Sequence, residues 1–166
     1  MAMKLIRTQA GDGIFVNLIK DDRFKHDRIA VNFILPLARE TATGYALLPF
    51  LMQRGYAGCS DFTAFARKLD ELYGATVAGK VSKAGNYQII TLTITHVDDR
   101  YTLNGEPLAE ECARLLAEIV TMPAIKNGRF DPEAVATEKN SLADTIAAEV
   151  NDKRSYAVTR CTELLF

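Results

Sequence analysis

Histidine is scarce in this sequence, and tryptophan is absent. The 166-residue chain has two histidines, His26 and His96, which lie far apart in sequence. A zinc site carried by one helix needs two imidazoles three or four residues apart, so that both project from the same face. No such pair can be drawn anywhere in the chain, in either orientation of the motif. Zinc-dependent hydrolysis through a helical two-histidine motif is therefore excluded.

Cysteine is also too sparse to build a disulfide framework or a zinc knuckle. Cys59, Cys112 and Cys161 are odd in number, widely separated and surrounded by apolar or small residues. A disulfide-stapled fold or a zinc knuckle requires cysteines that are paired at short spacings. We therefore expect three reduced, structural thiols in the core.

The chain has neither an excess of one charge nor a long apolar run. Its 20 basic residues nearly balance 21 acidic ones, so it lacks the positive stripe that nucleic-acid binding requires. The longest apolar stretches, residues 29–38 and 45–52, fall short of the roughly 20 residues that cross a bilayer. The N-terminus also lacks the apolar core of a secretory signal. We expect no nucleic-acid partner, no membrane and a cytoplasmic location.

Composition and periodicity predict one domain over residues 1–166. With 48% hydrophobic residues, the chain can build one core but hardly two. Strand patterns occupy residues 13–20, 28–38, 75–83 and 87–97, and a turn at Ala84-Gly85-Asn86 joins the last two. In the last strand, Ile90, Leu92 and Ile94 alternate with threonines. This alternation predicts a strand with one apolar face.

Helical patterns fill most of the remaining chain. They cover residues 40–54, 61–73, about 108 to 122, a long segment from 131, and a last segment after the bend at 151–152. Asp131-Pro132-Glu133 has the order of cap, proline and acidic residue that starts a helix. Gly55 is expected to end the first helix in a left-handed cap. The element order predicts an α+β fold with a mainly antiparallel sheet packed against helices.

The first helix carries an unusual proline. Its expected core face consists of Ala46, Leu47, Phe50 and Leu51. Pro49 lies in the middle of this helix, where a proline removes a hydrogen bond and costs about 3 kcal/mol. We expect a compensating distortion, such as a kink that packs Phe50 inward.

Three stretches carry a resemblance to a known family. They are residues 40–43 leading to Gln53-Arg54-Gly55, residues 69–75, and residues 138–154. With the element order, they resemble the N-terminal repeat of insulinase-type (pitrilysin) metallopeptidases, most closely a non-catalytic bacterial subgroup that sits beside an active peptidase. The resemblance implies the LuxS/mitochondrial processing peptidase-like metallopeptidase fold. It also implies that residues 1–166 form an incomplete repeat of a longer protein, since the chain ends in mid-pattern.

The catalytic residues of active family members have no counterpart here. Those members carry an inverted zinc motif, His-x-x-Glu-His, on the helix before a basic residue and glycine. Counted back from Arg54-Gly55, the motif falls on residues 46–50, with Ala46 and Phe50 at the ligand positions and Pro49 at that of the base. The third ligand falls near Asp144 and Thr145, where one carboxylate remains at best. We therefore assign no catalytic and no metal-binding residue, and we expect zinc only in an active partner.

Other candidate sites have ordinary structural explanations. His96-Val97-Asp98-Asp99 has residue types for half a metal site, but a strand end followed by an acidic turn explains it better. His26 lies in a charge cluster typical of a solvated loop. Cys59 precedes a helix that could lower its thiol pKa, yet no histidine is near in sequence. The glycines of residues 11–13 and 79–82 lack the spacing of a phosphate loop and read as turns.

One positive site hypothesis comes from the resemblance. In the family, substrate peptides add as an extra strand to a sheet edge, a mode that depends on backbone amides and survives loss of the metal. The corresponding edge here is Ala75, Thr76, Val77, Ala78, Gly79, Lys80 and Val81. An edge strand guarded by Lys80 and Lys83 against aggregation is the alternative.

The functional hypothesis follows from two features: the chain resembles the family in its scaffold, and it lacks the residues of the catalytic zinc site. The chain is expected to be a catalytically inactive peptidase homologue that pairs with an active zinc peptidase subunit, or with a second repeat of its own full-length chain, and helps to bind peptide. Two alternatives stay open. The activity could need residues outside this sequence, or the domain could be purely structural.

Overall fold

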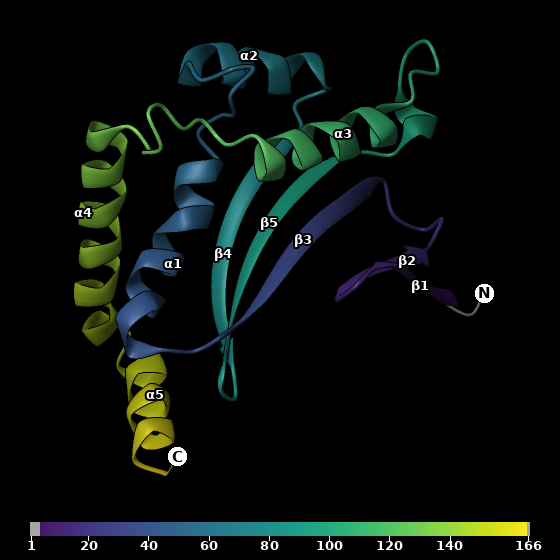
Figure 1. The fold of residues 1–166 in the computed structure, drawn as a ribbon. Coiled ribbons are helices and arrows are strands. Elements are labelled where there is room, and N and C mark those ends of the chain that lie inside the picture. The colour runs from purple at the N-terminus through teal and green to yellow at the C-terminus, as the bar shows by residue number, and fades with distance from the viewer. Residues whose placement is uncertain (1–3, 166) are drawn as a thin grey trace.

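A three-stranded antiparallel sheet forms the centre of the computed structural model, which describes residues 4–165. Its strands are β3 (His26–Pro36), β4 (Thr76–Ala84) and β5 (Tyr87–Val97), in the order β3-β5-β4 (Figure 1). The register runs unbroken from the β4–β5 turn, where Tyr87 pairs with both Ala84 and Pro36. The long strand β5 therefore lies in the middle, and β3 and β4 are the two edges.

The two faces of this sheet differ as the alternation in β5 predicts. Ile90, Leu92 and Ile94 are buried beneath helices. On the other face, the Thr91 hydroxyl donates to the Asn32 side-chain oxygen at 2.8 Å, and Arg28 donates to the Thr93 hydroxyl at 3.3 Å. These polar pairs satisfy the hydroxyl groups of Thr91 and Thr93, which are themselves buried at 8% and 6% exposure. The prediction of one apolar face on this strand is confirmed.

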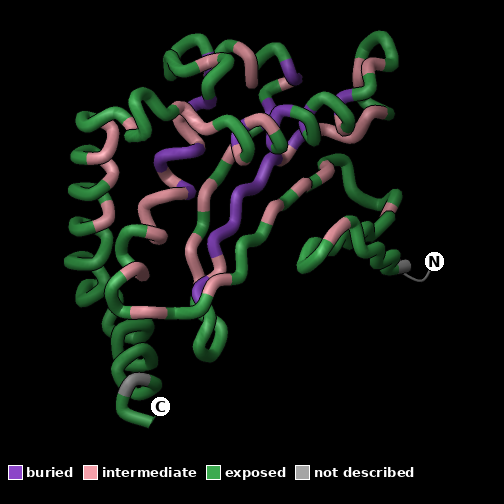
Figure 2. Tube along the Cα trace, viewed as in Figure 1, coloured by how far each residue is buried: buried purple, intermediate pink, exposed green. Residues whose placement is uncertain are grey.

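Helices α1 (Arg39–Met52) and α3 (Leu108–Thr121) cover the apolar face. Helix α2 (Phe62–Glu71) adds Phe65 to the same core, and a short 3₁₀ turn, η1 (Asp99–Tyr101), precedes α3. The buried positions gather around β5 and α3 (Figure 2), and the core contains Met52, Tyr56, Phe65, Leu72, Ala75, Leu92, Ile94, Leu108, Cys112, Leu115, Leu116 and Ile119. The α+β prediction with an antiparallel sheet is confirmed.

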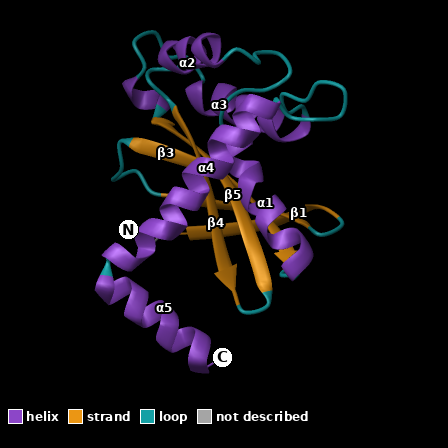
Figure 3. Ribbon diagram, turned by 90° about the vertical axis from the view of Figure 1, so that its left-hand side faces the viewer, coloured by secondary structure: helices purple, strands orange, loops and turns teal. Residues whose placement is uncertain are grey.

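The C-terminal helices lie outside this core. α4 (Pro132–Ala148) packs beside α1, a 3₁₀ turn η2 (Glu149–Asn151) follows, and α5 (Lys153–Leu165) projects away from the sheet (Figures 1 and 3). The predicted start of α4 is confirmed, because the Asp131 carboxylate accepts the Ala134 amide at 2.9 Å with Pro132 in the first helical position. None of the helices described in residues 4–165 is long and apolar enough to cross a membrane.

The sequence prediction missed the first strand. β1 (Lys4–Gly11) pairs with β2 (Ile14–Lys20) in a separate hairpin at the β3 side of the molecule (Figure 1). The Asp12-Gly13 turn between them, with Gly13 at φ +68°, is a hairpin signal that was read only as a turn. The hairpin leaves large apolar side chains exposed, namely Leu5, Ile6, Ile14, Phe15, Val16, Leu18 and Ile19.

The predicted core face of α1 was partly wrong. Leu51 is buried as expected, but its buried neighbours are Pro49 and Met52, whereas Phe50 is only partly buried. The face is rotated because the proline itself is packed against the sheet. Gly55 was also assigned the wrong role. Its φ of +148° is not the left-handed cap conformation, and a Cβ there would lie 2.5 Å from the Cys59 carbonyl oxygen.

Helix α1 approaches β4 through its backbone. A Cβ built on Gly79 would lie 2.6 Å from the carbonyl oxygen of Pro49 and 2.8 Å from its Cβ. Only glycine leaves room for this contact. The same Pro49 carbonyl accepts the Gln53 amide at 3.2 Å, so the helix continues past the proline. The packing of Pro49 on Gly79 thus fixes the height of α1 above the edge strand.

We predict that Gly79→Ala destabilises the fold by about 1–3 kcal/mol, because the added methyl group overpacks a backbone contact. Chemical denaturation measures the effect. Gly44→Ala is the matched control, since Gly44 lies on α1 with nothing within 4 Å of a built Cβ. That substitution should be neutral or stabilise by up to about 1 kcal/mol through helix propensity. Equal stability of the two variants would contradict the close approach.

Candidate functional site

The helix that would carry a zinc motif lies directly over the edge strand, but it offers no metal ligand. Ala46 and Phe50 are half-buried on α1, and Pro49 is buried against Gly79. On the neighbouring helix α4, Asp144 is exposed and the Thr145 hydroxyl donates to the Ser141 carbonyl at 2.8 Å. The two helices lie side by side. Within residues 4–165, no three His, Cys, Asp or Glu side chains gather as a metal site would require.

Both histidines lie at the far end of the sheet from this helix turn. His26 pairs with Val97 and His96 pairs with Asp27, so the two imidazoles occupy neighbouring rungs of the β3–β5 ladder. Residues on successive rungs point to opposite faces of a sheet. His26 is exposed and His96 is 2% exposed. The two rings therefore cannot converge on one ion.

Structural hydrogen bonds engage most polar side chains of the His96 segment, and His96 Nε2 is buried without a hydrogen-bond partner among residues 4–165. The His96 ring nitrogen Nδ1 donates to the Val97 carbonyl at 2.7 Å. The Asp98 carboxylate accepts from the Arg100 guanidinium and amide, and this pairing lowers the pKa of Asp98. The Asp99 carboxylate accepts the Ala109 amide at 2.8 Å, at the start of α3. The segment is a strand end with capping carboxylates, which is the explanation that the sequence favoured.

The three cysteines occupy different environments, so the expectation of three core thiols was partly wrong. Cys112 is buried, and desolvation, the largest cause, raises the pKa of its thiol to about 11. Cys59 is half-buried in the loop between α1 and α2. Cys161 is exposed, because no layer of the structure covers this part of α5.

The edge segment predicted from the resemblance does lie on a sheet edge. β4 begins at Thr76, whereas Ala75 is buried and its amide donates to the Leu69 and Leu72 carbonyls. The Gly79 amide donates to the Gln53 side chain at 2.9 Å and therefore points away from β5. Backbone groups alternate in direction along an antiparallel strand. Val77 and Val81 accordingly also present their backbone groups to the outer edge.

A cavity of about 520 Å³ lies at the start of this edge. Thr76 and Val77 line it together with Phe62, Phe65 and Leu69 of α2, and with two carboxylates, Asp70 and Glu138, and one cation, Arg54. We call it the edge pocket. Its apolar wall beside a strand edge can receive a side chain from an added strand.

An ion pair in the lining of the edge pocket joins the turn after α1 to α4. Arg54 donates to the Glu138 carboxylate at 2.8 Å, and the guanidinium also lies 5.6 Å from the centre of the Phe62 ring. The two side chains are 36% and 15% exposed, so the contact is partly shielded from water. Arg54 therefore connects the turn after α1 with Glu138 on α4 and Phe62 on α2.

Comparisons with known proteins agree with this geometry. No family model matches the chain. Over 148 residues it is 32% identical to the "Probable inactive metalloprotease YmfF" of Bacillus subtilis strain 168, covering 89% of this chain and 35% of that protein. The chain is similar to a probable inactive metalloprotease. It thus spans about a third of that relative's length.

A solved structure shares the fold. The "conserved protein from Enterococcus faecalis V583" superimposes with a TM-score of 0.83 at 30% identity, over 93% of this chain and 36% of that one.

Sequence reasoning missed Gln53, Glu138 and Phe62 as parts of the site. Gln53 follows the last residue of α1 and bonds a strand 26 positions away, and Arg54 and Glu138 are separated by 84 positions. No local spacing predicts such pairs. The only available signal was that Arg54 and residue 138 both fell in stretches that carry the family resemblance.

We predict that Cys161 reacts first with iodoacetamide at pH 8, and that Cys112 stays unmodified in the folded chain. The raised pKa keeps the Cys112 thiol protonated, and burial denies access to the reagent. Intact mass spectrometry with peptide mapping measures the order of modification. All three thiols should react in denaturant, which serves as the control. Equal rates for Cys112 and Cys161 in the native chain would contradict the packing of α3.

We predict that Gln53→Ala speeds hydrogen exchange at the Gly79 amide about fivefold, because one hydrogen bond of about 1 kcal/mol is lost. NMR exchange measurements on the full chain resolve this single amide. Gln9→Ala is the control, since Gln9 lies in the distant β1–β2 hairpin. If Gly79 exchanges at the same rate in both variants, the Gln53 contact does not protect the edge.

Proposed function

We propose that the chain is a catalytically inactive peptidase homologue of the insulinase type that holds an extended peptide along β4, in the cytoplasm, beside an active zinc peptidase. The active component is a separate subunit or a second repeat of the full-length protein. The scaffold keeps the helix, the edge strand and the flanking helix α4 in place. The residues Ala46, Pro49 and Phe50 offer no ligand to a zinc ion.

The observation that carries the proposal is an outer strand edge beneath a helix whose residues Ala46, Pro49 and Phe50 have no side-chain donor for a metal. Val77 and Val81 present backbone groups outward, and within residues 4–165 a side chain occupies the outward amide of the intervening Gly79 alone, through Gln53. A peptide that adds here gains main-chain hydrogen bonds of about 0.5–1.5 kcal/mol each. None of these bonds requires a metal.

The edge strand β4 is favoured over the other edge by its surroundings. β3 is also an outer strand, but only β4 has the edge pocket at its start and α1 packed on it. An added strand at β4 would therefore place one side chain against Phe62, Phe65 and Leu69. This arrangement supplies shape selectivity beside the sequence-independent backbone contacts.

Lys80 is consistent with either role of the edge. It is exposed on the polar face of the sheet, opposite Thr91. A charged side chain on an edge strand discourages uncontrolled pairing between sheets. It leaves the backbone of Val77 and Val81 accessible to a single extended peptide.

In this proposal, the Gln53 side chain competes with a bound peptide for the backbone amide of Gly79. A bound peptide must displace its side-chain oxygen from the Gly79 amide or leave that amide out of the pairing.

We therefore predict that Gln53→Ala raises peptide affinity about three- to tenfold, since the free chain no longer makes a bond that binding has to break. Isothermal titration with an apolar extended peptide measures the change, with Gln9→Ala as the control. Unchanged or weaker binding to Gln53→Ala would contradict competition at Gly79.

The proposal as a whole is tested by peptide titration and by cleavage assays. In spectra of the ¹⁵N-labelled full chain, extended peptides should shift the amides of Val77, Gly79 and Val81, and those of the β1–β2 hairpin should not move. The chain alone with added zinc should not cleave these peptides, whereas its mixture with an active peptidase encoded beside it should. Cleavage by the chain alone would overturn the inactive assignment. If no peptide shifts the amides of the β4 edge, the domain has a purely structural role.

A further inference from the structure

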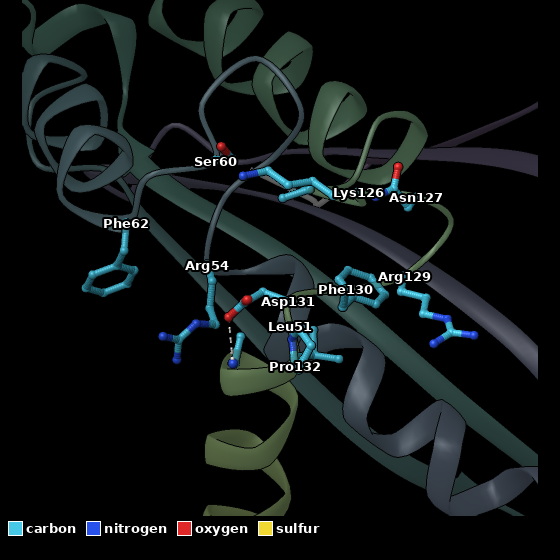
Figure 4. A pocket seen from close by; sticks show the side chains of 12 residues that line it. Leu51, Arg54, Ser60, Phe62, Lys126, Asn127, Arg129, Phe130, Asp131 and Pro132 are labelled. Atoms are coloured by element: carbon cyan, nitrogen blue, oxygen red, sulfur yellow. Dashed lines mark hydrogen bonds between the residues drawn. The ribbon is translucent and has the colours of Figure 1, made fainter.

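A second and larger cavity adjoins the edge pocket. It has a volume of about 650 Å³ and lies between the end of α1, the loop after it and the loop between α3 and α4. Arg54 and Phe62 line both cavities, so the two share a wall. We call this cavity the basic pocket (Figure 4).

The basic pocket has the opposite charge character to its neighbour. Lys126 and Arg129 line it together with Arg54, whose charge is already paired with Glu138, and with one carboxylate, Asp131, whose oxygen accepts the Ala134 amide. The edge pocket instead has two carboxylates against Arg54 alone. An anionic group is therefore attracted to the basic pocket and disfavoured in the edge pocket.

A rigid turn holds two of these cations in place. The Lys126 amide donates to the Arg129 carbonyl at 2.9 Å, and the Arg129 amide donates back at 3.1 Å. Asn127 and Gly128 between them have φ of +52° and +73°, as a two-residue hairpin turn with both central residues left-handed requires. The turn backbone therefore needs little ordering when a ligand binds.

The side chains of Lys126 and Arg129 lie exposed at opposite sides of the pocket. In Figure 4, Lys126 extends toward Ser60 and Arg129 extends to the other side, with Phe130 and Leu51 between Arg54 and Arg129. Neither the Lys126 nor the Arg129 side chain has a hydrogen-bond or ion-pair partner in the described part of the chain, residues 4–165. Leu51 is 6% exposed and supplies an apolar floor. An apolar floor with cations at the rim suits a carboxylate attached to an apolar body.

We propose that the basic pocket is a subsite for a peptide carboxylate, which it binds when the peptide lies along β4. This inference rests on the proposed peptide-binding edge. The strand begins at Thr76 beside the edge pocket, and the basic pocket lies beyond the shared wall of Arg54 and Phe62. A peptide antiparallel to β4 therefore directs its C-terminal end toward the basic pocket. The carboxylate is either the free C-terminus or an acidic side chain near it.

Peptides that differ only in charge separate these two sources. One apolar extended peptide is made with a free C-terminal acid, with a C-terminal amide, and with an amide preceded by Glu or by Gln. Fluorescence anisotropy gives the affinities, and the amides of Val77, Gly79 and Val81 report edge binding in the same samples. We expect the peptides with a carboxylate to bind about tenfold tighter than the neutral amide, with the difference shrinking as salt is added. Preference for the free acid over the Glu amide identifies a C-terminal subsite in an antiparallel peptide, and the reverse identifies an acidic side chain.

Variants locate the effect in the basic pocket. Lys126→Ala with Arg129→Ala should abolish the tenfold preference for carboxylate while the neutral amide binds as before. Lys139→Ala is the matched control, because Lys139 is exposed on α4 and lines neither pocket. If all peptides shift the edge amides with equal affinity, or if Lys139→Ala has the same effect as the double variant, the basic pocket is not a subsite and the edge proposal stands. If no peptide shifts the edge amides, the edge proposal fails and this inference fails with it.

Discussion

The backbone contact between α1 and β4 at Pro49 and Gly79 is the constraint on which the rest of the site depends. A missing Cβ on the strand lets the helix approach until a side chain at Gly79 would collide with the Pro49 carbonyl. At this distance the Gln53 side chain reaches the edge of β4, and the next residue, Arg54, reaches Glu138 on α4. A helix held further from the sheet would make neither contact. Gly79 thus sets the position of α1 relative to β4, and with it the position of the Gln53 side chain at the strand edge.

The same contact explains how a proline is tolerated inside helix α1. A proline inside a helix removes one donor and costs about 3 kcal/mol, but here it is buried and packed on the sheet, and the Pro49 carbonyl keeps its own helical hydrogen bond. Burial of apolar surface offsets part of the cost. The packing of Pro49 on Gly79 is therefore what stabilises a proline in the interior of α1.

Charge divides the surface beside β4 into two regions. Asp70 and Glu138 face the edge pocket, whereas Lys126 and Arg129 face the basic pocket, and Arg54 stands between them. The Asn127-Gly128 turn fixes the backbone of the two cations, and α4 starts at the same place with Asp131 as its cap. Recognition at a strand edge depends on the peptide backbone and so carries little sequence information. In the proposed function, the unequal charges of the two pockets would make the β4 edge selective among peptides of different charge.

The sequence by itself determined the absence of a two-histidine zinc motif, the α+β class and the apolar face of β5, because these depend on which residues are present and on their spacing along one element. Local signals also located the start of α4 at Asp131-Pro132. The first strand was missed because Leu5 and Ile6 are followed by polar residues, and its pairing with β2 is visible only in three dimensions. Only the tertiary structure decided which face of α1 is buried, that Cys161 is exposed, and that Gln53 meets Gly79 and Arg54 meets Glu138. These contacts join positions far apart in sequence, and no periodicity within one helix or strand records them.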